Sequence, residues 1–441
     1  TTSTTAYATF YAPLAISGNT IYVAYPDPGA SSKMSVKNYN SATSTWDYFP
    51  STTSSGISTA AGGYSSIAIN QTTGNPVLSY RSNSQISILN YDGTAWGNVG
   101  DTESIQPTAP ASAGPNTNVA ADGNIVYATY VNSASGGYNA PIVARYDGSA
   151  WTHTQLFTTS GTSNAQSYIR VAVGADHSAY VAYADQPQSN RLTVRKFNTT
   201  SNEWDLLGPA VTTNTASYIS LSVDNNNIPY VAYRDNGGKP AVRKYNSTAN
   251  TWDLLVASGS TATSVYGNNS TFTTLAFDPI NNLPYLAFVD GGISGKLTVL
   301  KFNGGTVTGS ATGWEVVGGS AGFTPAAVTN IGLKVGSDNR PLVAVQMAYN
   351  TVDQTTANDY LYVYQGPVGT LPVTVSFLDA KAISRGIEVK WTTSSESNSD
   401  KFVVEKSTDG VTFAKITEVK SKGPSRYSII DADPENGENY Y

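Results

Sequence analysis

The stretch "NNNIPYVAYRDNGGKPAVRKYNSTANTWDLL", residues 225–255, holds three short apolar runs separated by polar turns. Its phrase "PYVAY" occurs seven times in related form, at intervals of 50 to 57 residues. Recurrence at a fixed period of this length indicates a repeat architecture, in which each copy is one supersecondary unit. The copies end at Tyr25, Tyr80, Tyr130, Tyr183, Tyr233, Phe288 and Val345.

Each repeat contains enough strand-forming sequence for one small sheet. A second apolar run precedes every "VAY"-like run, and a third, such as "PAVRKYN", follows it. Short apolar runs bounded by Asn, Asp, Gly and Ser predict strands joined by tight turns. Six repeats then add a fourth run that contains a tryptophan: Trp46, Trp96, Trp151, Trp204, Trp252 and Trp314.

Four strands in about 50 residues are typical of one blade of a β-propeller. The sequence therefore predicts an all-β fold whose main domain, residues 1–368, is a seven-bladed β-propeller of four-stranded blades. An open solenoid is the weaker alternative, because open arrays need distinct capping repeats. The seventh repeat lacks the tryptophan strand, and we expect "TTAYATF", residues 4–10, to pair as its outer strand and close the ring.

Composition excludes several classes of function. The chain has 441 residues, no cysteine, 13% charged residues and a net charge of −6. Thiol catalysis and Cys-ligated zinc are therefore excluded, and the absence of a basic cluster argues against nucleic acid as a partner. No apolar run approaches the roughly 18 residues that a membrane helix needs, so we expect no membrane insertion. The polar, uncharged composition suits an extracellular or outer cell-surface location, and we interpret the chain as a mature form.

A second domain begins near residue 369. The last 71 positions hold 20 charged residues, against 36 in the first 370. Runs such as "GIEVKWTTS" and "DKFVVEKS" predict strands, and "TDG" predicts a hairpin turn. We interpret residues 369–441 as an immunoglobulin- or fibronectin type III-like β-sandwich. Because such a sandwich needs roughly 90 to 100 residues, we expect it to be incomplete at its C-terminus.

The segments "LPVTVSFLDAK", "VKWTTSSESNSDKFVVEKSTDGVTF" and "DADPENGENYY" resemble the fibronectin-like module of secreted Bacteroidota proteins that use the type IX secretion system. In that family a sorting domain follows the module, and it is absent from this sequence. The resemblance implies export by the type IX secretion machinery to the cell surface or beyond. The "PYVAY" repeats also resemble those of secreted bacterial propellers, a group with no single activity to carry over.

The candidate binding site lies where the longest insertions emerge. Residues 99–116, 131–140, 256–270 and 346–359 all link strands on one face of the predicted propeller. Carboxylates, guanidinium groups and tyrosine rings on that face could hydrogen-bond and stack against sugars. For each Asp, capping of its own turn is the alternative. The candidate residues are Asp27, Arg81, Tyr138, Asp185, Arg234, Asp235, Tyr266, Asp290 and Tyr349.

Catalytic and metal signals are weak. The two histidines, His153 and His177, lie in different repeats without metal-site spacing, and we expect both to be surface or turn residues. We expect no cofactor, although "DADPENG", residues 431–437, could bind Ca²⁺. We interpret the tryptophans as packing residues, because they occupy one structural position.

Three functions remain open. The leading hypothesis is a binding propeller for glycan or another extracellular polymer. A structural or adhesive surface protein that self-associates is the first alternative, and a polysaccharide hydrolase or lyase is the second. The sequence favours a binding protein over an enzyme, because no unit contains a distinctive pair of carboxylates.

Overall fold

The computed structural model describes residues 2–4, 13–51, 56–100, 104–105, 112–134, 138–157, 168–303, 312–347, 360–366, 374–395, 401–410, 412–422 and 425–441. The chain forms two compact units, Thr1–Gly366 and Pro367–Tyr441. In the described ranges the only helical elements are single 3₁₀ turns, η1 (Pro28–Ala30), η2 (Gln186–Gln188) and η3 (Gly291–Ile293). None of the described helices has the length and apolar character to cross a bilayer. The chain is therefore an all-β protein.

The first unit consists of seven four-stranded antiparallel sheets. In chain order the strands are β2 (Leu14–Ser17), β3 (Thr20–Asp27), β4 (Lys33–Asn40) and β5 (Thr45–Tyr48); β6 (Gly63–Ile69), β7 (Pro76–Ser82), β8 (Gln85–Tyr91) and β9 (Trp96–Asn98); β10 (Ser112–Asp122), β11 (Ile125–Ala134), β12 (Tyr138–Tyr146) and β13 (Trp151–Gln155); β14 (Arg170–Val173), β15 (Ala179–Asp185), β16 (Arg191–Asn198) and β17 (Glu203–Leu206); β18 (Ser217–Val223), β19 (Pro229–Arg234), β20 (Pro240–Asn246) and β21 (Thr251–Leu254); β22 (Ser270–Phe277), β23 (Pro284–Asp290), β24 (Lys296–Phe302) and β25 (Trp314–Val316); and β26 (Thr329–Val335), β27 (Pro341–Met347) and β28 (Tyr360–Gln365), with β1 (Thr2–Thr4).

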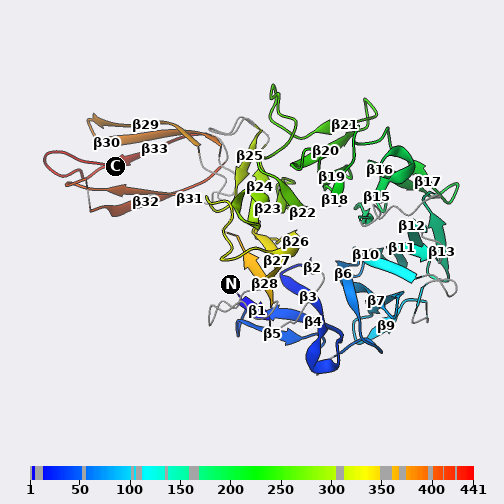
Figure 1. The fold of residues 1–441 in the computed structure, drawn as a ribbon. Coiled ribbons are helices and arrows are strands. Elements are labelled where there is room, and N and C mark those ends of the chain that lie inside the picture. Colours follow the sequence, from blue (N-terminus) through cyan, green and yellow to red (C-terminus); the bar gives the residue numbers. More distant parts are fainter. Residues whose placement is uncertain are drawn as a thin grey trace. The chain divides into compact units, whose positions relative to one another are not determined.

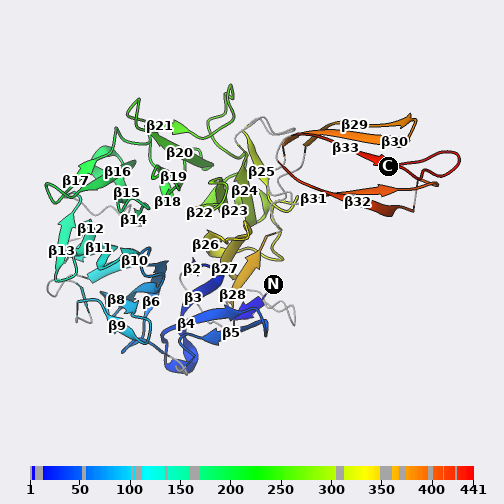
Figure 2. The same ribbon diagram turned by 180° about the vertical axis from the view of Figure 1, so that it is seen from behind.

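These sheets follow one another around a common centre (Figure 1; Figure 2 gives the view from behind). The first strand of each sheet is innermost, and it contacts the first strands of the sheets before and after it. Strand β26 contacts β2, so the last sheet meets the first. Antiparallel sheets arranged radially around a central channel define a β-propeller.

The N-terminal strand β1 is the fourth strand of the last sheet. Thr2, Ser3 and Thr4 pair with Val363, Tyr362 and Leu361 of β28. The expectation that N-terminal residues supply the missing outer strand is confirmed for Thr4. The rest of the predicted stretch, residues 5–10, lies outside the described residues.

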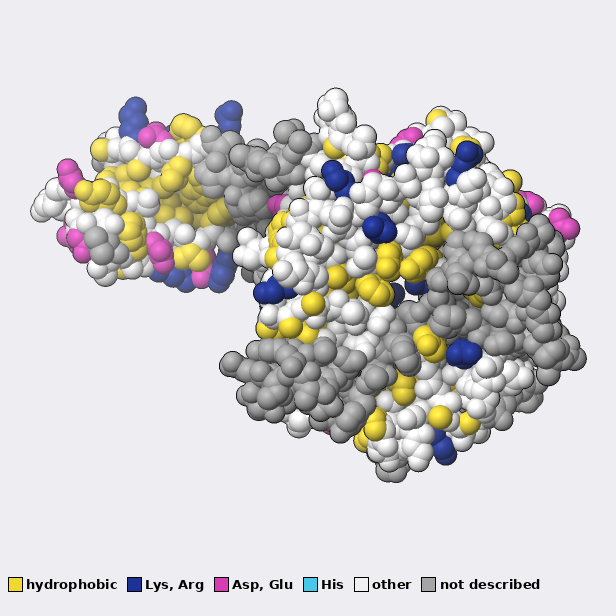
Figure 3. All heavy atoms as spheres, in the orientation of Figure 1, with side chains coloured by type: hydrophobic (Ala, Val, Ile, Leu, Met, Phe, Trp, Pro, Cys, Tyr) yellow, Lys and Arg dark blue, Asp and Glu magenta, His cyan; other side chains and the backbone are white. Residues whose placement is uncertain are grey.

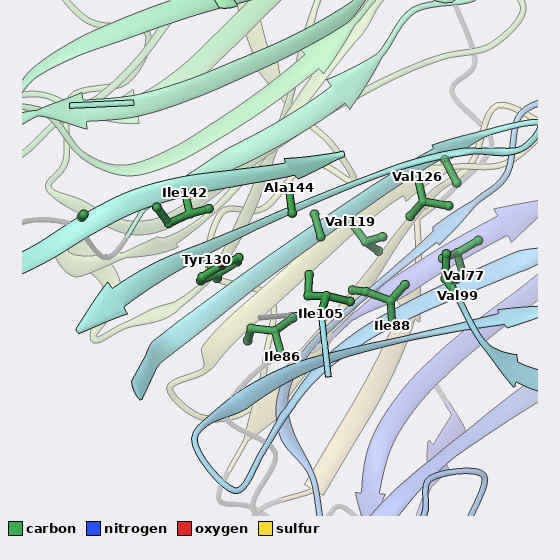
Figure 4. Close-up of a cluster of buried hydrophobic side chains, with 13 residues drawn as sticks. Val77, Ile86, Ile88, Val99, Ile105, Val119, Val126, Tyr130, Ile142 and Ala144 are labelled. Atoms are coloured by element: carbon green, nitrogen blue, oxygen red, sulfur yellow. The ribbon is translucent and has the colours of Figure 1, made fainter. Parts of the chain in front are cut away.

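The core lies between neighbouring sheets. Figure 4 shows one such layer, where Ile86 and Ile88 of β8 face Val119 of β10 and Ile142 of β12. The second strands are buried at nearly every position because a sheet covers each of their faces, which explains the near-continuous apolar run "YVAY".

Four of the six repeat tryptophans connect their sheet to the one before it. The indole Nε1 of Trp96, Trp151, Trp252 and Trp314 donates to the main-chain carbonyl of Phe49, Val99, Leu207 and Leu255, respectively. Each acceptor comes directly after the outer strand of the preceding sheet. The structure thus confirms the packing role of these tryptophans and adds a polar contact between sheets.

The second unit has a three-stranded sheet, β29 (Thr374–Ile383), β30 (Gly386–Ser395) and β33 (Arg426–Asp431), and a two-stranded sheet, β31 (Lys401–Lys406) and β32 (Ala414–Lys420). Trp391, Val404 and Tyr427 form its buried core, drawn from both sheets. The rings of Trp391 and Tyr427 stack with centroids 5.2 Å apart. Two sheets that share one apolar layer are the arrangement of a β-sandwich.

Candidate functional site

The inner strands enclose a cavity of about 430 Å³ along the propeller axis. Its lining comes from the first strand of all seven sheets and from the turns that follow, including Gln71, Asn225 and Pro279. That volume lies within the range of sites that bind small ligands, roughly 300 to 1,000 Å³. Figure 3 looks toward this central opening, where basic atoms lie among apolar ones.

Most polar groups along the channel hold neighbouring inner strands together. Asn118 on β10 accepts a hydrogen bond of 2.8 Å from the amide of Val171 on β14 and donates one of 3.0 Å to Ser66 on β6. Ser220 on β18 accepts a hydrogen bond of 3.1 Å from the amide of Leu275 on β22. These side chains satisfy backbone amides of the neighbouring inner strands that would otherwise lack partners.

Two cations break the pattern of the channel wall. Lys334 on β26 pairs with Leu342, the position that precedes the "VAV" run of its sheet. The same register in the other six sheets carries alanine or serine: Ala15, Ala68, Ala120, Ala172, Ser222 and Ala276. Arg170 on β14 lies two residues nearer the start of its strand, at a position that is uncharged in the other sheets. The lining contains both cations, and none of its described residues is acidic.

The environment of Lys334 is unusual for a lysine. Its side chain lines the channel and is exposed to water, although protein forms the walls around it. Burial lowers the pKa of its ammonium group, with no acidic neighbour opposing the shift. Among the described residues no salt bridge involves Lys334.

A set of aromatic residues, here named the collar, stands where the inner strands begin. It comprises Tyr64, Tyr168, Tyr218 and Phe272, each four residues before an alanine or serine of the wall. Links from the outer strands arrive at this end of the channel, so the collar lies toward the face that carries the predicted insertions. Rings of three successive sheets contact one another, with centroids 4.9 Å apart for Tyr168 and Tyr218 and 5.1 Å apart for Tyr218 and Phe272.

Three collar residues adopt a backbone conformation that bulky side chains rarely take. The φ angles of Tyr64, Tyr218 and Phe272 are 49°, 51° and 51°, and Asn330 has 49° at the same place in the last sheet. In each of these sheets the pairing register shifts there, which marks a β-bulge. Bulges re-aim side chains, and left-handed bulky residues concentrate at functional sites. The collar is therefore an aromatic surface whose backbone conformation is energetically unfavourable.

Three of the predicted aspartates are buried and have hydrogen-bond partners within the protein. Asp27, Asp185 and Asp290 are 5%, 5% and 0% exposed. A hydroxyl eight residues later donates to each carboxylate, from Ser35, Thr193 and Thr298, respectively. Asp27 and Asp290 also accept from amides of η1 and η3, as the turn-capping alternative predicts, whereas Asp185 makes no such bond.

The other predicted polar residues lie nearer the collar. Arg81 pairs with Gly63, beside the Tyr64 ring, and its guanidinium carbon lies 5.7 Å from the centroid of that ring. Arg234 occupies the same register opposite Ser217, next to Tyr218. In both arginines Nε is buried without a hydrogen-bond partner. Asp235 caps its own turn, because its carboxylate accepts a hydrogen bond of 2.8 Å from the Lys239 amide.

Of the three predicted tyrosines, the structure describes the side chain of Tyr266 only. Tyr266 is half-buried and packs against Phe288 with centroids 5.2 Å apart, and its pKa is raised by burial and then by the Asp290 carboxylate. Tyr138 begins β12, but its side chain lies outside the described residues, as does all of Tyr349. The structure therefore brings Arg81 and Arg234 to the collar and leaves Tyr266 beside a buried aspartate.

The histidines and the predicted Ca²⁺ stretch have local partners. His177 contacts the Asp122 carboxylate from an exposed turn, and Tyr130 Oη lies 3.1 Å from His153 Nδ1. Asp431 pairs with Lys406 at 3.1 Å and accepts from Tyr441. Across the described ranges no group of three or more His, Asp or Glu side chains is placed to hold a metal ion.

Arg170, Lys334 and the collar were not among the sequence candidates. Their signal was present as a departure from the repeat, because a charge in "IRVAV" or "IGLKV" stands where the other inner runs are uncharged. The collar could have been found by aligning the residues just before each inner run. Loop length alone directed attention to the insertions instead.

No family model matches the chain, and no curated protein matches it. Among solved structures, a puromycin hydrolase mutant aligns at 11% identity and a TM-score of 0.46, covering 88% of this chain and 58% of the hydrolase. Aleuria aurantia lectin in complex with Fucα1-6GlcNAc aligns at 14% identity and a TM-score of 0.44, covering 72% of this chain and 99% of the lectin. A protein of unknown function from Dyadobacter fermentans aligns at 12% identity and a TM-score of 0.41, covering 69% of this chain and 94% of that protein. The proposed function therefore rests on this chain's own residues.

Proposed function

We propose that the protein is a secreted, seven-bladed β-propeller that binds glycan, or another extracellular polymer, at the collar. The seven four-stranded sheets and the pairing of β1 with β28 support the blade count. Residues 369–441 are the fibronectin-like module of the protein. Their two sheets and shared core support this assignment.

The observation that carries the proposal is the conformation of the collar. Aromatic rings at Tyr64, Tyr218 and Phe272 are kept in left-handed bulges, each of which costs of order 1–3 kcal/mol. Packing of the propeller does not require an aromatic ring in this conformation, because Asn330 fills the same position in the last sheet. Flat aromatic rings stack on sugar faces with little entropy to lose, and the two tyrosines add a polar tip.

Donors surround the rings. Arg81 lies over Tyr64 and Arg234 lies beside Tyr218, so guanidinium groups stand within reach of a ligand that stacks on the collar. A stacked ring with adjacent hydrogen-bond donors is the arrangement that recognises a sugar hydroxyl or ring oxygen. The rings of Tyr168, Tyr218 and Phe272, from three successive sheets, contact one another and form one continuous part of this surface.

A glycan array with the full chain and a Tyr218→Asn variant tests the proposal. Asparagine tolerates left-handed φ, and the last sheet already carries one there, so the variant should fold. Loss of one stacking ring should weaken binding about tenfold or more. The matched control is Leu206→Asn, which removes an exposed apolar side chain from outer strand β17. Equal binding by all three proteins would refute the collar as the site.

Export by the type IX secretion machinery to the outer cell surface is part of the proposal. It is supported by the resemblance of residues 371–441 to the module found in such cargo. Expression in a Bacteroidota host, with the family's sorting domain appended, tests it. Surface display that disappears in a type IX mutant is the expected outcome, and unchanged display would contradict it.

The alternatives have less support. Large apolar side chains exposed on the described part of the first unit are Leu206 on strand β17 and Ile280 and Phe323 on two different connections. They lie on separate elements, whereas self-association needs a contiguous patch. A hydrolase or lyase would place paired carboxylates at its site, and the described lining of the channel has none.

A further inference from the structure

We infer that the central channel, below the collar, is a second site that binds an oxyanion, with Lys334 and Arg170 as its cationic ligands. It lies deeper than the proposed glycan site and does not depend on it. The ligand chemistry is a carboxylate, sulfate or phosphate group, free or carried by a molecule that fits a cavity of about 430 Å³.

The placement of Lys334 is the first support. The position holds alanine or serine in six sheets, so packing of the propeller does not require a long side chain there. A lysine in this register lines the channel, and among the described residues no acidic side chain forms an ion pair with it. A cation that lines a walled channel without an acidic partner attracts an anion more strongly than one on an open surface does.

Arg170 supplies the second charge from the opposite part of the ring. Lys334 and Arg170 belong to the last and fourth sheets, and their registers differ by two residues, or about 7 Å along the axis. One Arg170 nitrogen donates to the Ile169 carbonyl at 2.9 Å, which fixes the head group beside the channel. Two cations at different depths favour a ligand longer than a single atom.

The remaining lining carries no negative charge that would repel an anion. No described lining residue is a carboxylate, and Asn118, Ser220 and Ser222 already bond neighbouring inner strands. The aspartates of the nearby turns have internal partners: Asp224 and Asp278 accept from amides of their own turns. A protein with net charge −6 thus keeps a positive potential in its channel.

Calorimetric titration of the full chain tests the inference. Sodium glucuronate, sodium sulfate and neutral glucose are added to wild type, Lys334→Ala and Lys244→Ala at matched ionic strength. Lys334→Ala restores the residue found in most sheets, so it should fold with an unchanged melting temperature. Lys244 lies over the Tyr230 ring on the third strand of its sheet and serves as the charge-matched control.

We expect wild type and Lys244→Ala to bind at least one of the two anions and not glucose. Lys334→Ala should bind about ten- to a hundredfold more weakly, as for loss of a hydrogen bond to a charged group. Sulfate binding alone identifies a free oxyanion as the ligand, and glucuronate binding identifies an acidic sugar. Tyr218→Asn should leave anion binding unchanged, which separates this site from the collar.

The inference is overturned if neither anion binds to wild type at millimolar concentration, or if Lys334→Ala binds as tightly as wild type. A collar that binds glycan while the channel binds no anion would remove this inference and leave the proposed function intact.

Discussion

The indole Nε1 of Trp252 donates a 3.1 Å hydrogen bond to the main-chain carbonyl of Leu207, which follows the outer strand of the preceding sheet. Its ring also packs on Tyr245, the residue opposite it across β20 and β21, with centroids 5.2 Å apart. One side chain therefore joins two neighbouring sheets by a polar contact and its own strands by an aromatic one.

Trp252→Phe should keep the aromatic packing and lose the hydrogen bond. We expect the free energy of unfolding to fall by about 1 kcal/mol or somewhat more, since the smaller ring also leaves space. Urea unfolding measures the change. Trp391→Phe in the second unit is the control, because Trp391 Nε1 is buried without a partner and its loss breaks no hydrogen bond. Equal destabilisation by both changes would contradict a role for the Trp252 hydrogen bond.

Asp290→Asn should destabilise the propeller although it conserves shape. One carboxylate oxygen accepts from the Gly292 amide and from Asn268, and the other accepts from Thr298 at 3.1 Å. The neutral amide keeps one acceptor oxygen, so all these bonds lose their charge assistance and the Thr298 contact must reverse its direction, which should cost about 1.5–3 kcal/mol. Thermal unfolding compares the variant with Asp185→Asn, which breaks no bond to its turn amides and should cost less. A larger effect at Asp185 would argue against turn capping as the cause.

The sequence predicted the repeat far better than the site. Turn spacing and the apolar "VAY" runs give the strands of every sheet, because a strand covered on both faces has few alternatives. The aspartates were candidates both for ligand binding and for capping their own turns, because a carboxylate after a strand looks the same in sequence whether it faces solvent or a turn amide. Only Ser35, Thr193 and Thr298, eight residues later, could have shown that their partners are internal. The collar depends on bulges, which insert a residue without altering composition.

His153 should make stability depend on pH in the weakly acidic range. Burial lowers its pKa in the folded protein, although a backbone hydrogen bond at Ile105 partly opposes the shift. The unfolded chain, with a pKa near 6.5, therefore binds more protons as the pH falls below that value. Stability should be unaffected by this group above pH 7 and should decrease from about pH 6.5 downward. Urea midpoints measured from pH 7.5 to 5 should change less in His153→Gln than in wild type.

The other histidine provides the control. His177→Asn suits the left-handed φ of 65° at that turn and leaves His153 in place. The part of the acid dependence that disappears in His153→Gln should persist in His177→Asn. A flat profile in His177→Asn, with an unchanged one in His153→Gln, would assign the effect to the turn instead.

Removal of residues 1–4 should open the last sheet at its outer edge. Thr2, Ser3 and Thr4 form the fourth strand beside Leu361, Tyr362 and Val363, so their loss exposes the backbone groups of β28. The truncated chain should melt several degrees lower and associate more readily at high concentration, because an unpaired edge is a template for another strand. Differential scanning calorimetry with light scattering measures both effects. Ser3→Ala keeps the backbone pairing and should behave as wild type, whereas an unchanged melting temperature after truncation would show that β1 does not stabilise the ring.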